Sequence, residues 1–149
     1  ADLLEFVGDA QLHFGRFRAA LAYFEAAAGE RESLLGGAHP AVADALDRVA
    51  AVLVAENAFN KAEPLLQRAH AIRARALGAE HPDTAQSLSA LASLLKSQGK
   101  RAEAMDMQRR ALDVLERAVG PSHPLTAQSL HSLVSERKRA CRSTRTSRF

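Results

Sequence analysis

Several features that point to other classes of protein are scarce or missing in this sequence. The chain of 149 residues has one cysteine, Cys141, so no disulfide can form within it. No apolar stretch approaches the ~20 residues that a membrane-spanning helix needs. No basic segment followed by an apolar run opens the chain, as a secretory signal requires. We therefore expect no membrane span, no secretion and a reducing, cytoplasmic location.

Motifs that carry phosphate binding or catalysis are missing as well. The sequence contains none of the patterns Gly-x-Ser-x-Gly, Gly-x-x-x-x-Gly-Lys-Ser/Thr, Gly-x-Gly-x-x-Gly or His-Glu-x-x-His. Cys141 has arginine neighbours, but nothing in the sequence supplies it with a catalytic base or a pocket. The prediction is a protein that is not an enzyme and that has no catalytic residue, cofactor or metal.

Charge is spread unevenly along the chain. The net charge is +3, from 20 Lys and Arg against 17 Asp and Glu. Six of the basic residues and one of the acidic residues fall in residues 136–149, so this tail carries +5 and the preceding segment −2. Such a tail can neutralise phosphates, solvate the end of a repeat array, or dock onto acidic residues of its own chain.

The dipeptide His-Pro recurs at a fixed interval. It occurs at residues 39–40, 81–82 and 123–124, which are 42 residues apart each time. A constant period of this size predicts a repeat protein. The register gives a partial repeat at 1–38, full repeats at 39–80 and 81–122, and the start of a final capping helix at 123–135. The basic tail, residues 136–149, follows.

Each repeat is expected to hold two helices, because apolar residues recur within it in two runs at helical spacing. Asn57 and Gly99 separate the two runs, since both residue types tolerate the left-handed conformation that ends a helix. Gly36, Gly78 and Gly120 end the second run of each repeat. The prediction is an all-α chain of helix pairs.

Pro64 falls inside a predicted second helix, where proline is ordinarily unfavourable. An N-cap at Asn60, answered by Glu63 as in a capping box, would leave Pro64 among the first four helical residues. Those amides have no intrahelical partner, so proline would be tolerated there.

Six histidines raise the possibility of a metal site. His39, His81 and His123 occupy the same place in successive repeats. Neighbouring repeats are offset by two helix diameters of about 8–10 Å each, too far for a shared zinc ion. We therefore predict a structural role at the junctions, and a solvated or packed side chain for the others, His13, His70 and His131.

Several segments resemble one known family. Residues 15–27, with small Ala20 and Ala27 around bulky Phe24, are similar to the helix-turn-helix centre of a tetratricopeptide repeat. The 42-residue period, the segment at 61–69 and the Leu-Gly-x-x-His-Pro junction at 77–82 resemble the kinesin-light-chain type. The resemblance covers residues 1–135. It implies a right-handed α-solenoid of antiparallel helix pairs, a superhelix whose concave groove binds a peptide or a partner helix.

The resemblance also implies which residues line that groove, because the first helix of each pair faces it in this family. The candidates are Asp2, Glu5, Asp9, His13, Asp44, Asp47, Ala51, Val54, Gln86, Ser89, Ser93, Lys96, Gln128, His131 and Ser135. The groove is then acidic near the N-terminus, and a protein or peptide ligand is expected to present basic residues to the first repeats. Replacing Asp44 and Asp47 by lysine is expected to alter binding and to spare folding.

The resulting functional prediction is an interaction scaffold or adaptor. Two alternatives stay open. One is an adaptor for nucleic acid or an anionic surface that works through the basic tail. The other is a regulatory repeat segment of a larger enzyme or signalling protein.

Overall fold

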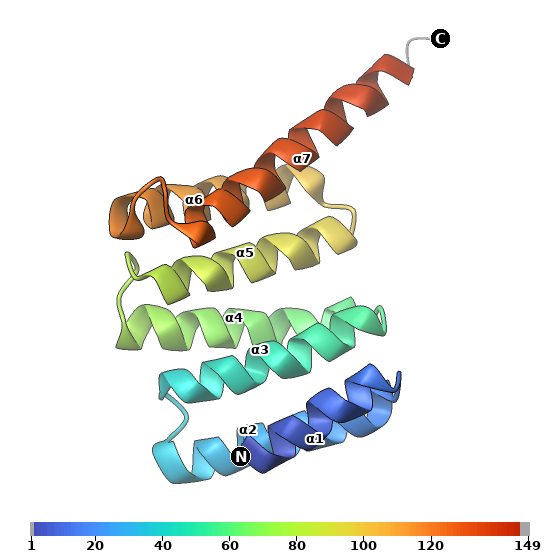
Figure 1. The fold of residues 1–149 in the computed structure, drawn as a ribbon, viewed down its shortest axis with the longest axis vertical. Coiled ribbons are helices and arrows are strands. Elements are labelled where there is room, and N and C mark those ends of the chain that lie inside the picture. The colour runs from blue at the N-terminus through green and yellow to red at the C-terminus, as the bar shows by residue number, and fades with distance from the viewer. Residues whose placement is uncertain (1, 147–149) are drawn as a thin grey trace. The chain divides into compact units, whose positions relative to one another are not determined.

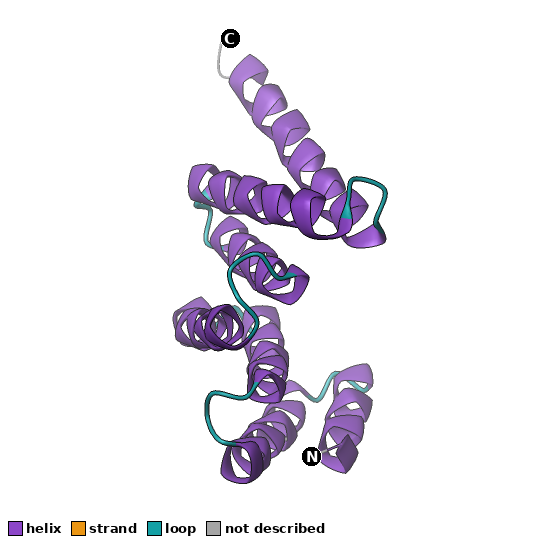
Figure 2. Cartoon of the chain, turned by 90° about the vertical axis from the view of Figure 1, so that its left-hand side faces the viewer, coloured by secondary structure: helices purple, strands orange, loops and turns teal. Residues whose placement is uncertain are grey.

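The computed structural model describes residues 2–146, with side chains up to residue 139. Within this range it contains seven α-helices joined by short loops and no strand (Figures 1 and 2). The helices are α1 (Asp2–His13), α2 (Phe17–Leu35), α3 (Pro40–Ala55), α4 (Phe59–Ala76), α5 (Pro82–Ser97), α6 (Arg101–Val119) and α7 (Pro124–Thr146). They form two compact units, Ala1–Ala79 and Glu80–Phe149.

The first unit holds the predicted partial repeat and the first full repeat. Helix α2 packs against both α1 and α3, and α3 packs against α4. Val42 and Leu46 of α3 and Ile72 of α4 form the centre of its hydrophobic core, while Phe24 of α2 is fully buried.

The second unit holds the second full repeat and the final helix. Helix α6 packs against both α5 and α7, and its core joins Ala85 of α5 to Val114 and Leu115 of α6. Helix α7 runs without a break to Thr146, and its C-terminal half projects past α6 in Figure 1. The predicted division between 123–135 and 136–149 therefore falls inside one helix.

Alanine occupies two equivalent buried positions in the second helix of every pair. These positions are filled by Ala20, Ala62 and Ala104, and by Ala27, Ala69 and Ala111. A side chain of one methyl group lets neighbouring helices approach closely without a cavity between them. The same contact thus recurs at the 42-residue period.

The junction histidines have a specific structural role. His39, His81 and His123 precede α3, α5 and α7, and the ring Nδ1 of each accepts a hydrogen bond from the backbone N–H two residues later, at 3.1–3.2 Å. The proline that follows each histidine takes the first helical position, where its missing N–H would have no partner. The histidines are therefore N-caps, a role that the sequence indicated only as a place at the junction.

The loops between the paired helices have the backbone conformation that the sequence predicts. Asn57 has a φ of 59°, and Gly99, at the same place in the next repeat, has a φ of 82°. Both lie in the left-handed region that the sequence pattern predicts for a helix end.

The prediction for the start of α4 is wrong. The N-cap is Ala58, which provides no side-chain hydrogen bond, and Pro64 lies in the helix interior. Proline at this position removes the N–H that would bond the carbonyl of Asn60, four residues earlier. Both Asn60 and Pro64 are exposed, so water can satisfy that carbonyl.

The capping role of His39 gives a stability prediction. His39→Ala removes the acceptor for the Ala41 N–H and is expected to destabilise the protein by about 1 kcal/mol, as loss of an N-cap generally does. His39→Asn restores an acceptor and is expected to recover most of that loss. Urea unfolding of the two variants measures the difference, and equal stabilities would show that the cap contributes nothing.

Candidate functional site

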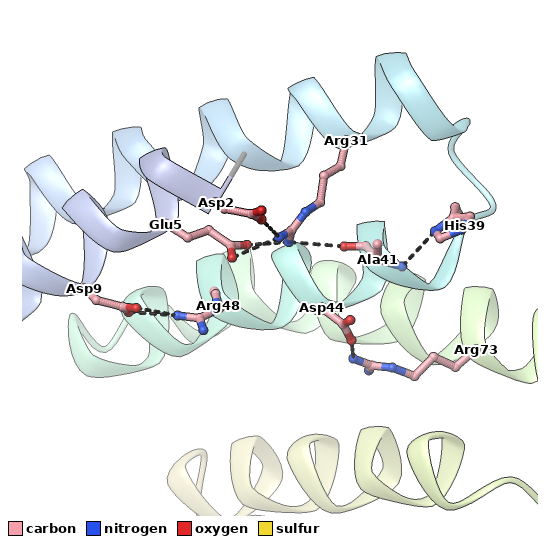
Figure 3. A network of polar contacts seen from close by, with 9 residues as sticks. All are labelled: Asp2, Glu5, Asp9, Arg31, His39, Ala41, Asp44, Arg48 and Arg73. Carbon is pink, nitrogen blue, oxygen red and sulfur yellow. Dashed lines mark hydrogen bonds and ion pairs between the residues drawn. The ribbon is translucent and has the colours of Figure 1, made fainter.

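Two of the three predicted acidic residues of α1 share one arginine partner. Arg31 of α2 donates hydrogen bonds to Glu5, at 3.0 Å to Oε2, and to Asp2, at 3.3 Å (Figure 3). Arg31 also reaches the carbonyl of Ala41 on α3, at 3.5 Å. The arginine therefore joins three helices of the first unit: it binds two predicted groove residues of α1 and a backbone carbonyl of α3.

The next repeat builds the same arrangement. Arg73 of α4 contacts Asp44 at 2.6 Å and Asp47 at 2.7 Å, both on α3. The Arg73 side chain is only 7% exposed. Burial on its own lowers the pKa of Arg73, but the hydrogen bonds and attraction from Asp44 and Asp47 outweigh this and raise it. The guanidinium is thus held charged between two carboxylates.

Asp47 is the more buried of the two carboxylates. Burial raises the pKa of Asp47 above its ordinary value, although the charge of Arg73 acts in the opposite direction. Within the described part of the chain, no group donates a hydrogen bond to its buried Oδ1. Without Arg73 this carboxylate would be a partly buried charge without a counter-charge.

Asp9 completes the acidic set of the first unit. Its carboxylate accepts a hydrogen bond from Arg48 of α3 at 2.8 Å, and both side chains are about half exposed. The Arg48 guanidinium also lies 5.8 Å from the ring centre of Phe24, within range of a cation–π interaction. All five predicted acidic residues of the first unit therefore have an arginine partner.

In both arrangements an arginine of a second helix is held by two acids of a first helix, and we call each one a clamp. The sequence contains a signal for both clamps. Arg31 and Arg73 are 42 residues apart, as are Asp2 and Asp44, and an acid follows three residues after each aspartate. The arginines are not among the predicted groove residues, because they lie on the second helices and the prediction covers only the first helices.

One expectation has to be corrected on this geometry. Lysine at positions 44 and 47 would place two cations against the buried guanidinium of Arg73. Like charges at such distances repel, and Arg73 would lose both of its partners. The double substitution therefore does not spare folding and cannot isolate a binding effect.

The second unit has a polar pocket at the corresponding place. Its volume is about 330 Å³, and it lies between α5 and α7 with α6 at its floor. Its lining includes four predicted groove residues, Gln86, Ser89 and Ser93 from α5 and Gln128 from α7. The structure therefore brings these four residues together around one concave surface.

Gln108 of α6 contributes a buried polar group to this pocket. Its side-chain amide donates to the Ser129 Oγ at 2.8 Å and lies 3.4 Å from the Ser89 Oγ. Gln108 is 8% exposed. These contacts connect α5, α6 and α7, and sequence reasoning about the first helices did not include this residue.

An ion pair lies at one end of the same surface. Lys96 of α5 contacts Glu136 of α7 at 2.7 Å, and both line a small hollow together with Ser93 and Gln108. The hydrogen bond from Lys96 lowers the pKa of Glu136 below its ordinary value, against a smaller opposing effect of burial. Among the predicted groove residues, Lys96 is thus held by a carboxylate of α7.

The remaining candidates are not part of these clusters. His13 and Ala51 are exposed, and Val54 is half-buried, all in the first unit. In the second unit, His131 is exposed and Ser135 is half-buried, and neither lines the 330 Å³ pocket.

Among the described residues, no group of three or more His, Cys, Asp or Glu side chains is arranged to hold a metal ion. No described helix has both the length and the apolar character needed to cross a bilayer. The side chain of Cys141 lies outside the described residues.

Comparison with known proteins places this geometry in context. The family model described as tetratricopeptide repeat matches residues 1–74 and 48–117. No curated protein matches the sequence.

Two solved structures show the fold. A protein from Podosopora anserina, assigned as a kinesin light chain with nearly identical TPR-like repeats, is 21% identical with a TM-score of 0.78 over 91% of this chain. BtubC (BKLC) from P. vanneervenii is 20% identical with a TM-score of 0.81 over 93% of this chain. The aligned region spans 64% and 56% of those chains. The predicted all-α solenoid class, with repeats of the kinesin-light-chain type, is confirmed.

The clamp around Arg73 gives a prediction for folding. Arg73→Met leaves the partly buried Asp47 without its arginine partner and is expected to destabilise the protein by about 3 kcal/mol. The control is Arg68→Met, which removes an arginine whose ion pair with Glu32 is nearly half exposed, and which should lose less than about 1 kcal/mol. Denaturant unfolding compares them, and equal losses would show that Arg73 is not a structural clamp.

The ion pair of α7 gives a pH prediction. The lowered pKa of Glu136 means that its contribution to stability is full above the unfolded-state value of about 4.3 and is lost as pH falls through the folded-state value. Glu136→Gln should therefore be less stable than the native protein at neutral pH, by about 1 kcal/mol or less. Thermal melts from neutral pH into the acid range test this, since the difference should shrink progressively once the pH falls below about 4.3; a constant difference would contradict it.

Proposed function

Because this chain belongs to the tetratricopeptide repeat family, whose repeats generally mediate protein–protein interaction, we propose that it is a scaffold or adaptor. Its ligand is a peptide or a partner helix. The ligand binds to the surface formed by the first helices of the repeats and, in the second unit, by α5 and α7.

The observation that carries this proposal is the pocket of the second unit. Residues that the family resemblance implies as groove residues, on two separate helices, line one hollow of about 330 Å³. That volume lies at the lower end of the range for ligand pockets, and amides and hydroxyls that converge on one place are typical of sites that fix a ligand's orientation. Such groups suit the alternating donors and acceptors of a peptide backbone.

The first unit offers a different surface. Arg31, Arg48 and Arg73 already neutralise its acidic residues. A basic residue of the ligand is therefore attracted only weakly, because the arginines offset most of the negative charge. The attraction is strongest at Asp2 and Asp44, whose side chains are well exposed. We retain basic residues facing the first repeats as a secondary feature of the ligand, and place the main binding contribution in the second unit.

Catalysis is not part of the proposal. The tetratricopeptide repeat fold is a non-catalytic interaction scaffold, and we assign no enzymatic activity or cofactor to this chain. The cytoplasmic location stays a prediction from sequence.

The basic end of the chain keeps its alternative role as a prediction. Arg137, Lys138 and Arg139 are exposed on α7, where they could contact phosphates of nucleic acid or of an anionic surface. A truncation at residue 135 would cut α7 within the helix and remove Glu136, the partner of Lys96. Substitution of the three basic residues therefore tests the role of the tail without removing Glu136, which truncation would remove. A role as a regulatory segment of a larger protein also stays a prediction.

The scaffold proposal is tested by selecting peptides from a randomised displayed library on the intact chain. Ser93→Arg places a long charged side chain at an exposed position of the pocket wall, so folding should be unchanged and affinity for selected peptides should fall about tenfold or more. Fluorescence anisotropy with a labelled peptide measures the change.

Ala118→Arg is the matched control. It adds the same charge at an exposed position of α6 away from the pocket. Peptide affinity should be retained in this variant. Equal losses in both variants, or a library that yields no binding peptide, would contradict the proposed function.

A further inference from the structure

The pocket arises at a position where the repeats differ. Arg31 and Arg73 stand at the same place in the first two helix pairs, and Leu115 stands there in the third. The acids that hold those arginines are likewise replaced. Gln86 occupies the repeat position of Asp2 and Asp44, and Ser89 occupies that of Glu5 and Asp47. The third pair therefore has neither the cation nor the carboxylates of the clamp.

The replacement residues are among those that line the pocket. Gln86, Ser89 and Leu115 all face the hollow of about 330 Å³. Leucine is shorter than arginine and cannot reach across to the next helix, as Arg31 does when it meets the Ala41 carbonyl of α3. The space that an arginine fills in the first unit is thus open in the second.

A second exchange in the same helix has the opposite polarity. Phe24 and Leu66 are buried apolar residues at one position of the repeat, and the third pair has Gln108 there. A buried amide in place of a hydrophobic side chain is unfavourable unless it is hydrogen-bonded. The –NH₂ group of Gln108 meets Ser89 and Ser129, whereas no group of the described residues donates to its Oε1.

From these two exchanges we propose that the pocket between α5 and α7 is a subsite for an uncharged amide side chain, glutamine or asparagine, of a bound peptide. Gln108 at the floor recognises the amide, Gln128 on α7 contacts it from the rim, and Leu115 packs against its methylene groups. This inference rests on the proposed function and names the ligand class of the same surface.

The lining disfavours charged and apolar side chains. No charged residue lines the pocket, so a buried Lys, Arg, Asp or Glu of the ligand would lose its hydration without gaining a counter-charge. An apolar side chain would leave the free acceptor of Gln108 covered and unpaired. An amide offers a donor and an acceptor together, which matches the amides and hydroxyls of Gln108, Gln128 and Ser129.

The test uses the intact chain and one peptide enriched from the displayed library. At the position where selection converges on an amide, the peptide is synthesised with Gln, Lys, Glu or Leu. On the native protein the Gln peptide should bind about tenfold or more tightly than the other three. The variant Gln108→Leu restores the apolar residue type of the first two repeats, and should reduce or reverse the preference for Gln over Leu.

A second variant tests the same subsite without changing a buried residue. Gln128→Leu changes an exposed residue of the rim and leaves the buried contacts of α6 intact. It should weaken binding of the Gln peptide and leave the Leu peptide unchanged. Circular dichroism melts verify that both variants are folded.

The outcomes separate this inference from the proposed function. Peptides that bind, lose affinity with Ser93→Arg, and show no amide preference would overturn the amide subsite alone. The amide subsite is also overturned if the Gln108→Leu and Gln128→Leu variants are both folded and both keep the preference for the Gln peptide. A library that yields no binding peptide overturns the proposed function and this inference with it.

Discussion

Close packing of helices on alanine is the constraint on which the other features depend. The second helix of each pair has a buried alanine at two fixed positions, from Ala20 and Ala27 in the first pair to Ala104 and Ala111 in the third. A larger residue at these places would push the helices apart, because protein interiors have no spare volume. Since the contact recurs every 42 residues, each helix pair has the same frame. Residues at equal positions of different repeats can then be compared directly.

At equivalent positions of this common packing, the two units have different polar side chains. In the first unit the carboxylates on the first helices are paired with arginines of neighbouring helices, and Arg73 is buried between two of them. Such pairs connect helices and leave little net charge for a ligand. In the second unit the equivalent groups are amides and hydroxyls, and a pocket remains. Recognition there depends on directional hydrogen bonds, which distinguish ligands by their donor and acceptor pattern.

The period and the helix signals predicted most of the fold and part of the site. Glycine and Asn57 placed the helix ends correctly because their backbone preferences are local. The capping bonds of His39 and its equivalents were not predicted, since a ring nitrogen can accept only in one orientation at the junction. The start of α4 was assigned incorrectly, because Asn60 is a good capping residue by type but lies already inside the helix. Arg73 and Gln108 were missed because their partners lie on other helices, although comparison at a 42-residue offset would have identified both positions.

The most direct test of this account is to rebuild the clamp in the third helix pair. The triple variant Gln86→Asp, Ser89→Asp, Leu115→Arg gives the third helix pair the two acids and the arginine of the second pair, α3 and α4. If the pocket exists because the clamp is missing, this variant stays folded and its affinity for a peptide selected on the native protein falls about tenfold or more in a titration. A folded triple variant with unchanged peptide affinity would show that the pocket is not where the chain binds its ligand.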